Sequence, residues 1–186
     1  MSKVPSALTD MFERNQKHAE SRKGIPTLMQ MHNRQRTPDD GVMIITCADP
    51  RLNPYAIFGL DETAQQRFPV VIRNAGGRTF DALRSIAVLD AIGSPSTIVV
   101  MHHSDCGMTH FHDADVKNIL LSRTEDPAER KWIENTKYGE MLGPPEDSIR
   151  EDVTLLRNSP FVRKETQIVG VKYDVFKGTV EVINVP

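Results

Sequence analysis

The chain has 186 residues, of which 39% are hydrophobic and 26% are charged, so it is long enough to bury the core of one globular domain. Its formal net charge of −2 at pH 7 gives no indication of a nucleic acid or an anionic membrane surface as a partner. No apolar run approaches the roughly 20 residues of a membrane span, and residues 1–20 lack the apolar segment of a signal peptide, which predicts a cytoplasmic protein.

The first 40 residues predict a helical N-terminal extension. Residues 6–22 place Leu8, Met11 and Phe12 at helical spacing among many charged residues. This pattern is typical of an amphipathic helix, whose apolar stripe packs either on its own domain or on a partner.

Short apolar runs and helical patterns alternate along the rest of the chain. Strands are expected at 41–46, 70–73, 97–102 and on both sides of a turn at 174–178, and helices at 81–93 and 144–160. Asp81 is expected to cap the first of these two helices, and Gly93 is expected to end it. Residues 113–144 are polar and are the least regular part, although 127–141 are expected to be helical.

Strands that alternate with helices are typical of an α/β fold. The economical architecture is a mostly parallel central sheet with right-handed crossovers, flanked by helices. We therefore expect residues 1–186 to form a single domain that carries the helical extension over 1–40.

The two cysteines, Cys47 and Cys106, lie at the ends of predicted strands. Cys47 directly follows the first strand, and His103 and Cys106 directly follow the third. Functional groups in open α/β sheets gather beyond the carboxyl ends of the strands, so these three side chains are expected to meet. Two thiolates and one imidazole are a ligand set for Zn²⁺ that leaves a fourth position open. Buried inert cysteines or a disulfide between them are the alternatives.

Asp49 and Arg51 follow Cys47 within four residues. An arginine can hold a carboxylate in a bidentate pair, which would keep Asp49 from occupying the open position of the metal. The alternative interpretation is a surface salt bridge that contributes little.

Several motifs in the chain together resemble the β-class carbonic anhydrases. They are, in chain order, "CADPR", "VIRNAGG", "LRSIAVLDAIGS", "HHSDCGM", "EDSIREDVTLLRNSPFV" and "VGVKYDVFKGTVEVI". The resemblance covers most of residues 40–185 and is strongest to the compact branch of the family, which also contains carbonyl sulfide hydrolases. "VIRNAGGR" and "HHSDCGM" look especially like that hydrolase branch.

The resemblance implies a fold like that of the β-carbonic anhydrases, a dimer as the building block, and Cys47, His103 and Cys106 as the zinc ligands. It also implies that Asp49 and Arg51 form the catalytic dyad of the family. Many relatives have serine where Pro50 stands here, and proline biases the preceding residue toward extended conformations.

The expected activity is hydrolysis by a zinc-activated water molecule. A small linear substrate fits this chemistry, and we expect carbonyl sulfide (COS), which would give H2S and CO2, with some CO2 hydration besides. A carbonic anhydrase proper is the alternative, and a non-catalytic zinc-stabilised binding module is a further one. A hydrolase with Cys47 or Cys106 as nucleophile and His103 as base would leave Asp49 and Arg51 without a role.

The remaining polar residues are expected to carry less of the chemistry. His102 should point to the opposite face of its strand from His103 and is interpreted as structural. His110 and His112 are surface residues or proton shuttles. The "RNAGG" stretch at 73–77 is not a nucleotide-binding pattern, so its glycines are expected to pack closely beside the site.

Overall fold

The computed structural model describes residues 5–22, 24, 26–33, 41–60 and 69–186. They fall into two compact units, Met1–Gln35 and Arg36–Pro186. Parts of the predicted N-terminal extension, at 1–4, 23, 25 and 34–40, lie outside the described residues. The prediction that both units form a single domain stays a prediction.

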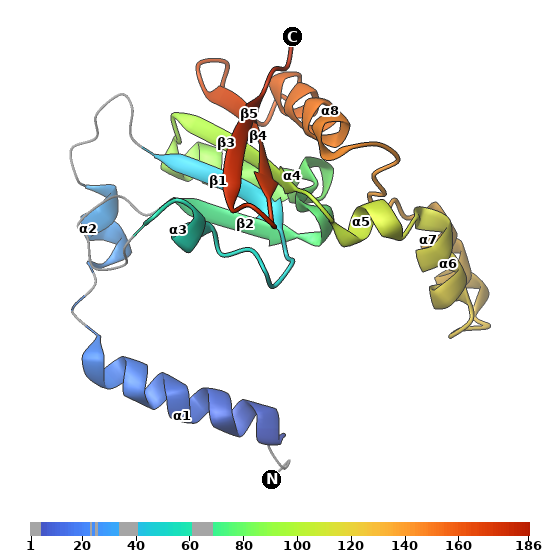
Figure 1. Cartoon of the computed structure of the whole chain (residues 1–186), viewed down its shortest axis with the longest axis horizontal. Helices are drawn as coiled ribbons and strands as arrows, with labels where there is room; N and C mark the ends of the chain where they lie inside the picture. The colour runs from blue at the N-terminus through green and yellow to red at the C-terminus, as the bar shows by residue number, and fades with distance from the viewer. Residues whose placement is uncertain (1–4, 23, 25, 34–40, 61–68) are drawn as a thin grey trace. The chain divides into compact units, whose positions relative to one another are not determined.

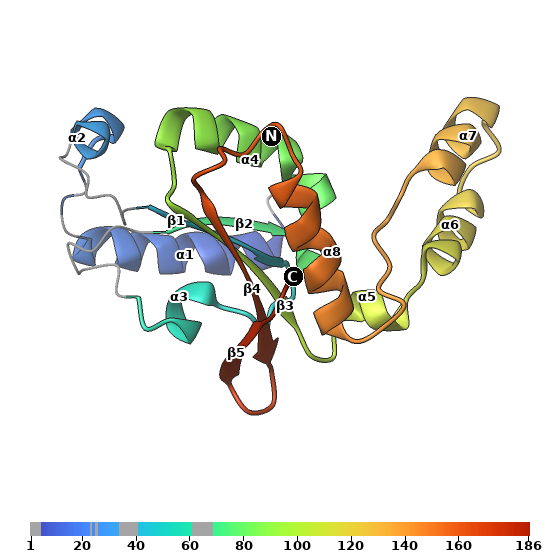
Figure 2. The ribbon, with the colours of Figure 1, turned by 90° about the horizontal axis from the view of Figure 1, so that it is seen from above.

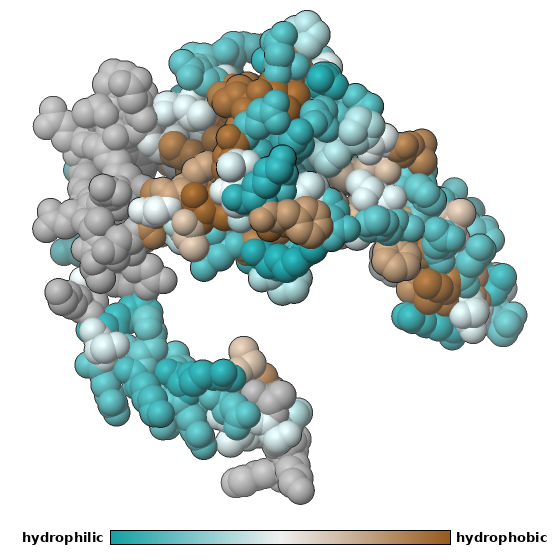
Figure 3. Space-filling view, in the orientation of Figure 1, coloured by the Kyte–Doolittle hydropathy of each residue, from teal (hydrophilic) through white to brown (hydrophobic). Residues whose placement is uncertain are grey.

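In its described residues the first unit contains two helices, α1 (Ser6–Ser21) and α2 (Leu28–His32). α1 ends within one residue of the range expected from the sequence. Its apolar stripe is exposed within this unit, since Leu8, Met11 and Phe12 are 40%, 56% and 55% accessible. In Figure 3 the hydrophobic colour on α1 is confined to the end nearest the N-terminus, while the rest of the helix is hydrophilic.

The second unit is built on a five-stranded sheet with the strand order β2-β1-β3-β4-β5 (Figure 1). The strands are β1 (Val42–Cys47), β2 (Val70–Asn74), β3 (Thr97–His103), β4 (Gln167–Asp174) and β5 (Thr179–Ile183). The first four are parallel to their neighbours, and only β5 runs antiparallel to β4. This confirms the prediction of a mostly parallel α/β sheet and places β1 directly beside β3.

Two long helices cover one face of the sheet and contact each other (Figure 2). They are α4 (Thr79–Gly93) and α8 (Pro145–Arg157). Their apolar side chains form one core cluster with Met43, Ile45, Ile98 and Val100 of the sheet. A second cluster, which includes Ile44 and Met101, lies on the other side of the same strands. Burial on both faces explains why β1 and β3 are continuous apolar runs instead of alternating ones.

The stretch at 113–144 is more regular than the sequence predicted. It contains α6 (Asp113–Leu121) and α7 (Pro127–Asn135), which contact each other. α7 begins where Asp126 accepts hydrogen bonds from the amides of Ala128 and Glu129, with proline at the first helical position. The short segments α3 (Pro54–Ile57) and α5 (Gly107–His110), and the 3-10 turn at Ala75–Gly77, were not predicted. No helix in the described part of the chain is long and apolar enough to cross a membrane.

The start of α4 corrects the prediction that Asp81 caps this helix. The helix begins two residues earlier, and its first amide, that of Thr79, donates to the carboxylate of Asp152 on α8 at 3.2 Å. The same carboxylate accepts from Nε of Arg78 at 3.0 Å and lies 3.2 Å from Nε2 of His102. A tertiary contact therefore provides the cap that a local residue was expected to provide.

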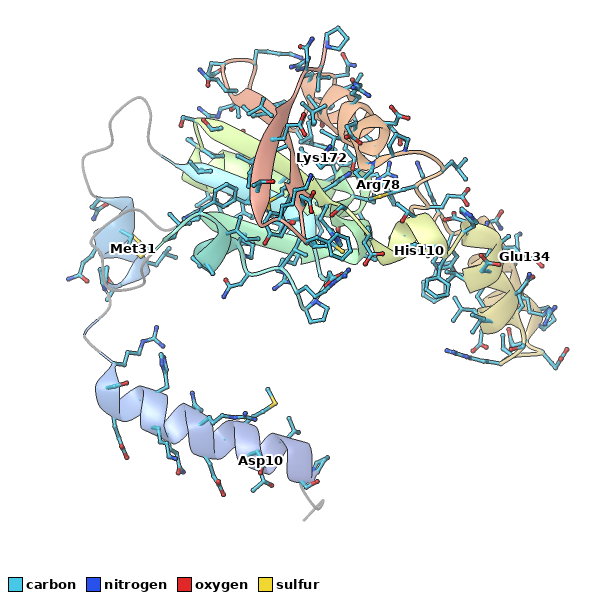
Figure 4. The ribbon with its side chains drawn as sticks, viewed as in Figure 1. Asp10, Met31, Arg78, His110, Glu134 and Lys172 are labelled. Atoms are coloured by element: carbon cyan, nitrogen blue, oxygen red, sulfur yellow. The ribbon has the colours of Figure 1, made fainter. Side chains whose placement is uncertain are left out.

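Asp152 and Arg78 form a buried ion pair, since their side chains are 1% and 2% exposed. Figure 4 shows Arg78 where the sheet meets α8. Burial raises the pKa of Asp152, but the hydrogen bond and charge of His102 and the charge of Arg78 outweigh it, so the net pKa is lowered. The carboxylate is therefore a stabilising charge at neutral pH.

Asp152→Asn should lower the free energy of unfolding by about 3 kcal/mol, because it removes the buried counter-charge of Arg78 and leaves only the exposed carboxylate of Glu151 as an ion-pair partner. Urea unfolding at pH 7 measures this. The matched control is Asp147→Asn on the same helix, where a pair with Arg150 is exposed and contributes less than about 1 kcal/mol.

The pH dependence of this difference follows from the lowered pKa of Asp152. The carboxylate stabilises the fold fully above the ordinary aspartate pKa of 3.8, and this contribution is lost as the pH falls through the lower folded value. The difference in the free energy of unfolding between wild type and Asp152→Asn should therefore become smaller only below pH 3.8. An Asp152→Asn variant as stable as Asp147→Asn would contradict the role of the buried pair.

Candidate metal centre

Three potential ligands converge at the carboxyl edge of the sheet. Cys47 is the last residue of β1 and His103 is the last residue of β3, and these parallel strands are neighbours. Cys106 follows three residues later, at the N-cap of α5. The ligand atoms of the three residues all lie within 4.8 Å of one another, and all three residues are buried.

The sulfur geometry fits a tetrahedral metal ion better than a disulfide. Cys47 and Cys106 are free cysteines whose Sγ atoms lie 3.9 Å apart. A disulfide would bring them to about 2.05 Å. Two Zn–S bonds of about 2.3 Å at the tetrahedral angle place the sulfurs about 3.8 Å apart.

The imidazole of His103 is also arranged so that it could bind a metal ion. Its Nδ1 lies 2.9 Å from the carbonyl oxygen of Ser104 and donates to it, which leaves a lone pair on Nε2. That Nε2 atom is buried and has no hydrogen-bond partner among the described residues. An unsatisfied buried nitrogen is costly, and a metal ion is a partner that this lone pair fits.

One of the two thiols is also arranged to lose its proton. The hydrogen bond with Cys106 lowers the pKa of Cys47, and backbone amides of Asp49 and Gly76 lower it further. The same sulfur contact, together with burial, raises the pKa of Cys106. The pair therefore shares one proton, which a cation bound to both sulfurs would displace.

The "RNAGG" stretch confirms the expectation of close backbone packing. Gly77 has a φ of +70°, and a Cβ there would lie 2.8 Å from the amide nitrogen of Cys47. Gly76 has a φ of +73°, and a Cβ there would lie 3.0 Å from the Met108 side chain. Both positions favour glycine because of their positive φ, and at Gly77 a side chain would also push against the backbone of β1 beside Cys47.

Asp49 and Arg51 form the bidentate pair that the sequence suggested. Nε of Arg51 donates to Oδ1 of Asp49 at 3.0 Å, and Nη2 donates to Oδ2 at 2.7 Å. The side-chain hydrogen bond of Arg51 lowers the pKa of Asp49 to about 2. Oδ2 of Asp49 also lies 3.9 Å from Nε2 of His103, so the carboxylate stands beside the ligand cluster and is no remote surface group.

Arg73 is a site residue that the sequence did not reveal. Its Nε donates to the carbonyl of Cys47 at 3.1 Å, and its Nη2 donates to the carbonyl of Asp49 at 2.7 Å. Arg73 lies opposite Thr46 in the register of β1 and β2. A basic residue at the carboxyl end of a strand next to β1 was the available signal, but the direction of its side chain could not be read from it.

The other histidines lie outside the ligand cluster. His102 is fully buried on the opposite face, where its Nδ1 lies 2.7 Å from Oγ of Ser148 on α8, so its structural interpretation is confirmed. The side chains of His110 and His112 are 60% and 46% exposed. His110, labelled on α5 in Figure 4, places Nε2 3.0 Å from Oδ1 of Asp105.

Comparison with known proteins identifies relatives of this chain. The family model of carbonic anhydrases matches residues 42–180. The chain is 32% identical over 142 residues to beta-carbonic anhydrase 1 of Mycobacterium tuberculosis, a match that covers 76% of this chain and 80% of that protein. It is 30% identical over 171 residues to the carbon disulfide hydrolase of an Acidianus species, covering 82% of this chain and 76% of that protein.

The fold agrees with solved structures of such proteins. The carbonic anhydrase of Glaciozyma antarctica superimposes with a TM-score of 0.75 at 29% identity, and the match covers 98% of both chains. The strand-end cluster of Cys47, His103 and Cys106 thus lies on a fold that carries enzymes acting on small carbon compounds.

Proposed function

Because the chain belongs to the β-carbonic anhydrase family, we propose that it is a zinc-dependent hydrolase that converts carbonyl sulfide and water to H2S and CO2, with some CO2 hydration besides. Cys47, His103 and Cys106 would hold the zinc. The observation that carries this proposal is the buried Nε2 of His103, which has no hydrogen-bond partner in the described part of the chain and lies beside two free thiols whose sulfurs are 3.9 Å apart.

The chain prepares the ligands before any metal binds. A bound zinc would acidify a water molecule, whose pKa falls to about 7 at catalytic zinc sites. The Ser104 carbonyl fixes the tautomer of His103, and the Met108 amide helps to stabilise the thiolate of Cys106. Two thiolates and a neutral imidazole balance the charge of a divalent cation.

Asp49 and Arg51 orient the attacking water in this proposal. With a pKa of about 2, the carboxyl group of Asp49 is ionised at neutral pH and can only accept hydrogen bonds. It can therefore take a hydrogen bond from the water and direct its lone pair toward the electrophilic carbon of the substrate. The bidentate contact with Arg51 keeps Asp49 in this place and away from the ligand position.

The surroundings of the cluster favour a sulfur-containing substrate. Cys47 and Cys106 belong to an apolar cluster with Ile44, Leu52, Met101, Met141 and Val171. Nε and both terminal nitrogens of Arg51 already donate to carboxylate or carbonyl oxygens. In the described part of the chain, Arg51 therefore has little donor capacity left for a charged bicarbonate product, whereas COS, H2S and CO2 are uncharged. The similarity to a carbon disulfide hydrolase points the same way.

A carbonic anhydrase proper is the second candidate. The observation that favours it is the similarity to a mycobacterial beta-carbonic anhydrase, which is 32% identical. Both reactions use the same ligands and the same dyad, so the two candidates differ only in the substrate. A hundredfold preference needs only about 2.7 kcal/mol.

Parallel assays on one preparation decide between the two substrates. We expect H2S release from COS well above that of Cys106→Ser, which serves as the control without an intact metal site. Proton release from CO2 is measured on the same samples. Fast CO2 hydration with H2S release no greater than the control would establish the carbonic anhydrase and exclude COS as the substrate.

We also propose a homodimer as the building block of the assembly, because the stripe of Leu8, Met11 and Phe12 is exposed within its own unit. β2 also lies at an edge of the sheet. Light scattering at micromolar concentration should give at least twice the mass of one chain, and a stable monomer would contradict the proposal.

The proposed compartment is the cytosol, where the thiols of Cys47 and Cys106 stay reduced.

A further inference from the structure

We propose that Asp105 is a positioning residue that fixes the guanidinium of Arg51 and so prevents Asp49 from occupying the metal position. This inference rests on the proposed function, since it concerns the same site. It assigns a role to a residue between His103 and Cys106 that is not itself one of the proposed ligands.

Asp105 contacts Arg51 through both its side chain and its backbone. Oδ2 of Asp105 accepts from Nη1 of Arg51 at 2.8 Å, and the Asp105 carbonyl oxygen accepts from Nη2, also at 2.8 Å. The other carboxylate oxygen, Oδ1, lies 3.0 Å from Nε2 of His110. The Asp105 carboxylate is therefore held from both sides.

The backbone of Asp105 has the conformation that this double contact needs. Its φ is +55°, one of only two positive values among the non-glycine residues that the structure describes. Aspartate and asparagine tolerate this left-handed region better than most residues. The turn lets the carbonyl and the carboxylate of one residue face the same guanidinium.

Arg51 consequently bridges the two segments that carry all three proposed ligands. One edge of its guanidinium holds Asp49, two residues after Cys47, and the other holds Asp105, between His103 and Cys106. The side chain of Arg51 is 45% exposed, so packing alone does not fix it. Without the Asp105 carboxylate, Arg51 can turn away. Asp49, whose Oδ2 is 3.9 Å from Nε2 of His103, would then be free to approach the ion.

The variant Asp105→Gly tests the role of the Asp105 carboxylate separately from that of the Asp105 backbone carbonyl. Glycine adopts a φ of +55° without strain, so the backbone carbonyl can keep its hydrogen bond to Arg51 while the side chain is removed. Asp105→Asn is the conservative comparison, because its amide oxygen can still accept from Nη1 and asparagine also tolerates the turn.

Azide binding to the cobalt-substituted protein reports whether the fourth ligand position is accessible, independently of turnover. The visible absorption bands of Co²⁺ change when azide binds. We expect Asp105→Gly to bind azide at least about tenfold more weakly than wild type and Asp105→Asn to stay within about threefold of it. In an Asp49→Asn background, Asp105→Gly should have no effect, because no carboxylate remains to compete for the ion.

Two results would overturn the proposal. One is an azide affinity of Asp105→Gly equal to that of wild type. The other is equal weakening in the Asp49→Asn background, which would indicate general damage to the site. If Asp105→Gly does not retain cobalt, Asp105→Ser is judged by the same criteria. A wild-type protein without thiolate-to-cobalt absorption bands would instead contradict the proposed function, so the two failures are distinguishable.

Discussion

Cys106→Ser should retain less than about 0.1 zinc per chain and should hydrolyse COS no faster than metal-free protein. A serine hydroxyl stays protonated at neutral pH, so the substitution leaves Cys47 and His103 as the only strong ligands of the cluster. Elemental analysis of dialysed protein measures the loss.

The control for this prediction is His112→Ala, which removes an exposed histidine that lies outside the cluster. It should keep its zinc, and circular dichroism should show that both variants are folded. Full zinc occupancy in folded Cys106→Ser would exclude Cys106 as a ligand.

Arg51→Ala should lower COS hydrolysis by about 10–100-fold while zinc stays bound. The substitution removes the bidentate partner of Asp49 but none of the three clustered residues. Metal content and turnover are measured on the same sample. Arg150→Ala, which removes an exposed arginine of α8, is the matched control and should behave as wild type.

The pKa of Asp49 indicates that Arg51→Ala should lower turnover by changing the position of the Asp49 carboxylate and not by changing its charge. Arg51 lowers that pKa to about 2, and without Arg51 it rises toward the ordinary value of 3.8. The contribution of the pair to stability is present above 3.8 and is lost as the pH falls through about 2. At pH 7 Asp49 is therefore ionised in both proteins. Wild-type turnover in Arg51→Ala would show that the carboxylate needs no partner to hold it.

The convergence of Cys47, His103 and Cys106 was predictable because it depends only on topology. Parallel neighbouring strands end at the same edge of a sheet, and apolar runs mark where β1 and β3 lie in the chain. The same reasoning places Asp49 and Arg51 beside the cluster, because they directly follow β1. Sequence patterns can therefore predict which residues meet at the ends of neighbouring parallel strands.

The features that the sequence did not reveal depend on side-chain direction or on contacts between distant segments. Arg73 and Asp105 reach the site because of a particular rotamer and a left-handed turn, neither of which has a periodic signal. The cap of α4 comes from Asp152, 73 residues away from Thr79, whereas local pattern reasoning could only choose the nearby Asp81.

The zinc content of the purified wild-type protein tests the central claim most directly. Inductively coupled plasma mass spectrometry on protein dialysed without chelator should find one zinc per chain, bound by the three residues that meet at the ends of β1 and β3. Folded protein that hydrolyses COS or hydrates CO2 with less than about 0.1 zinc or other divalent metal per chain would contradict the account.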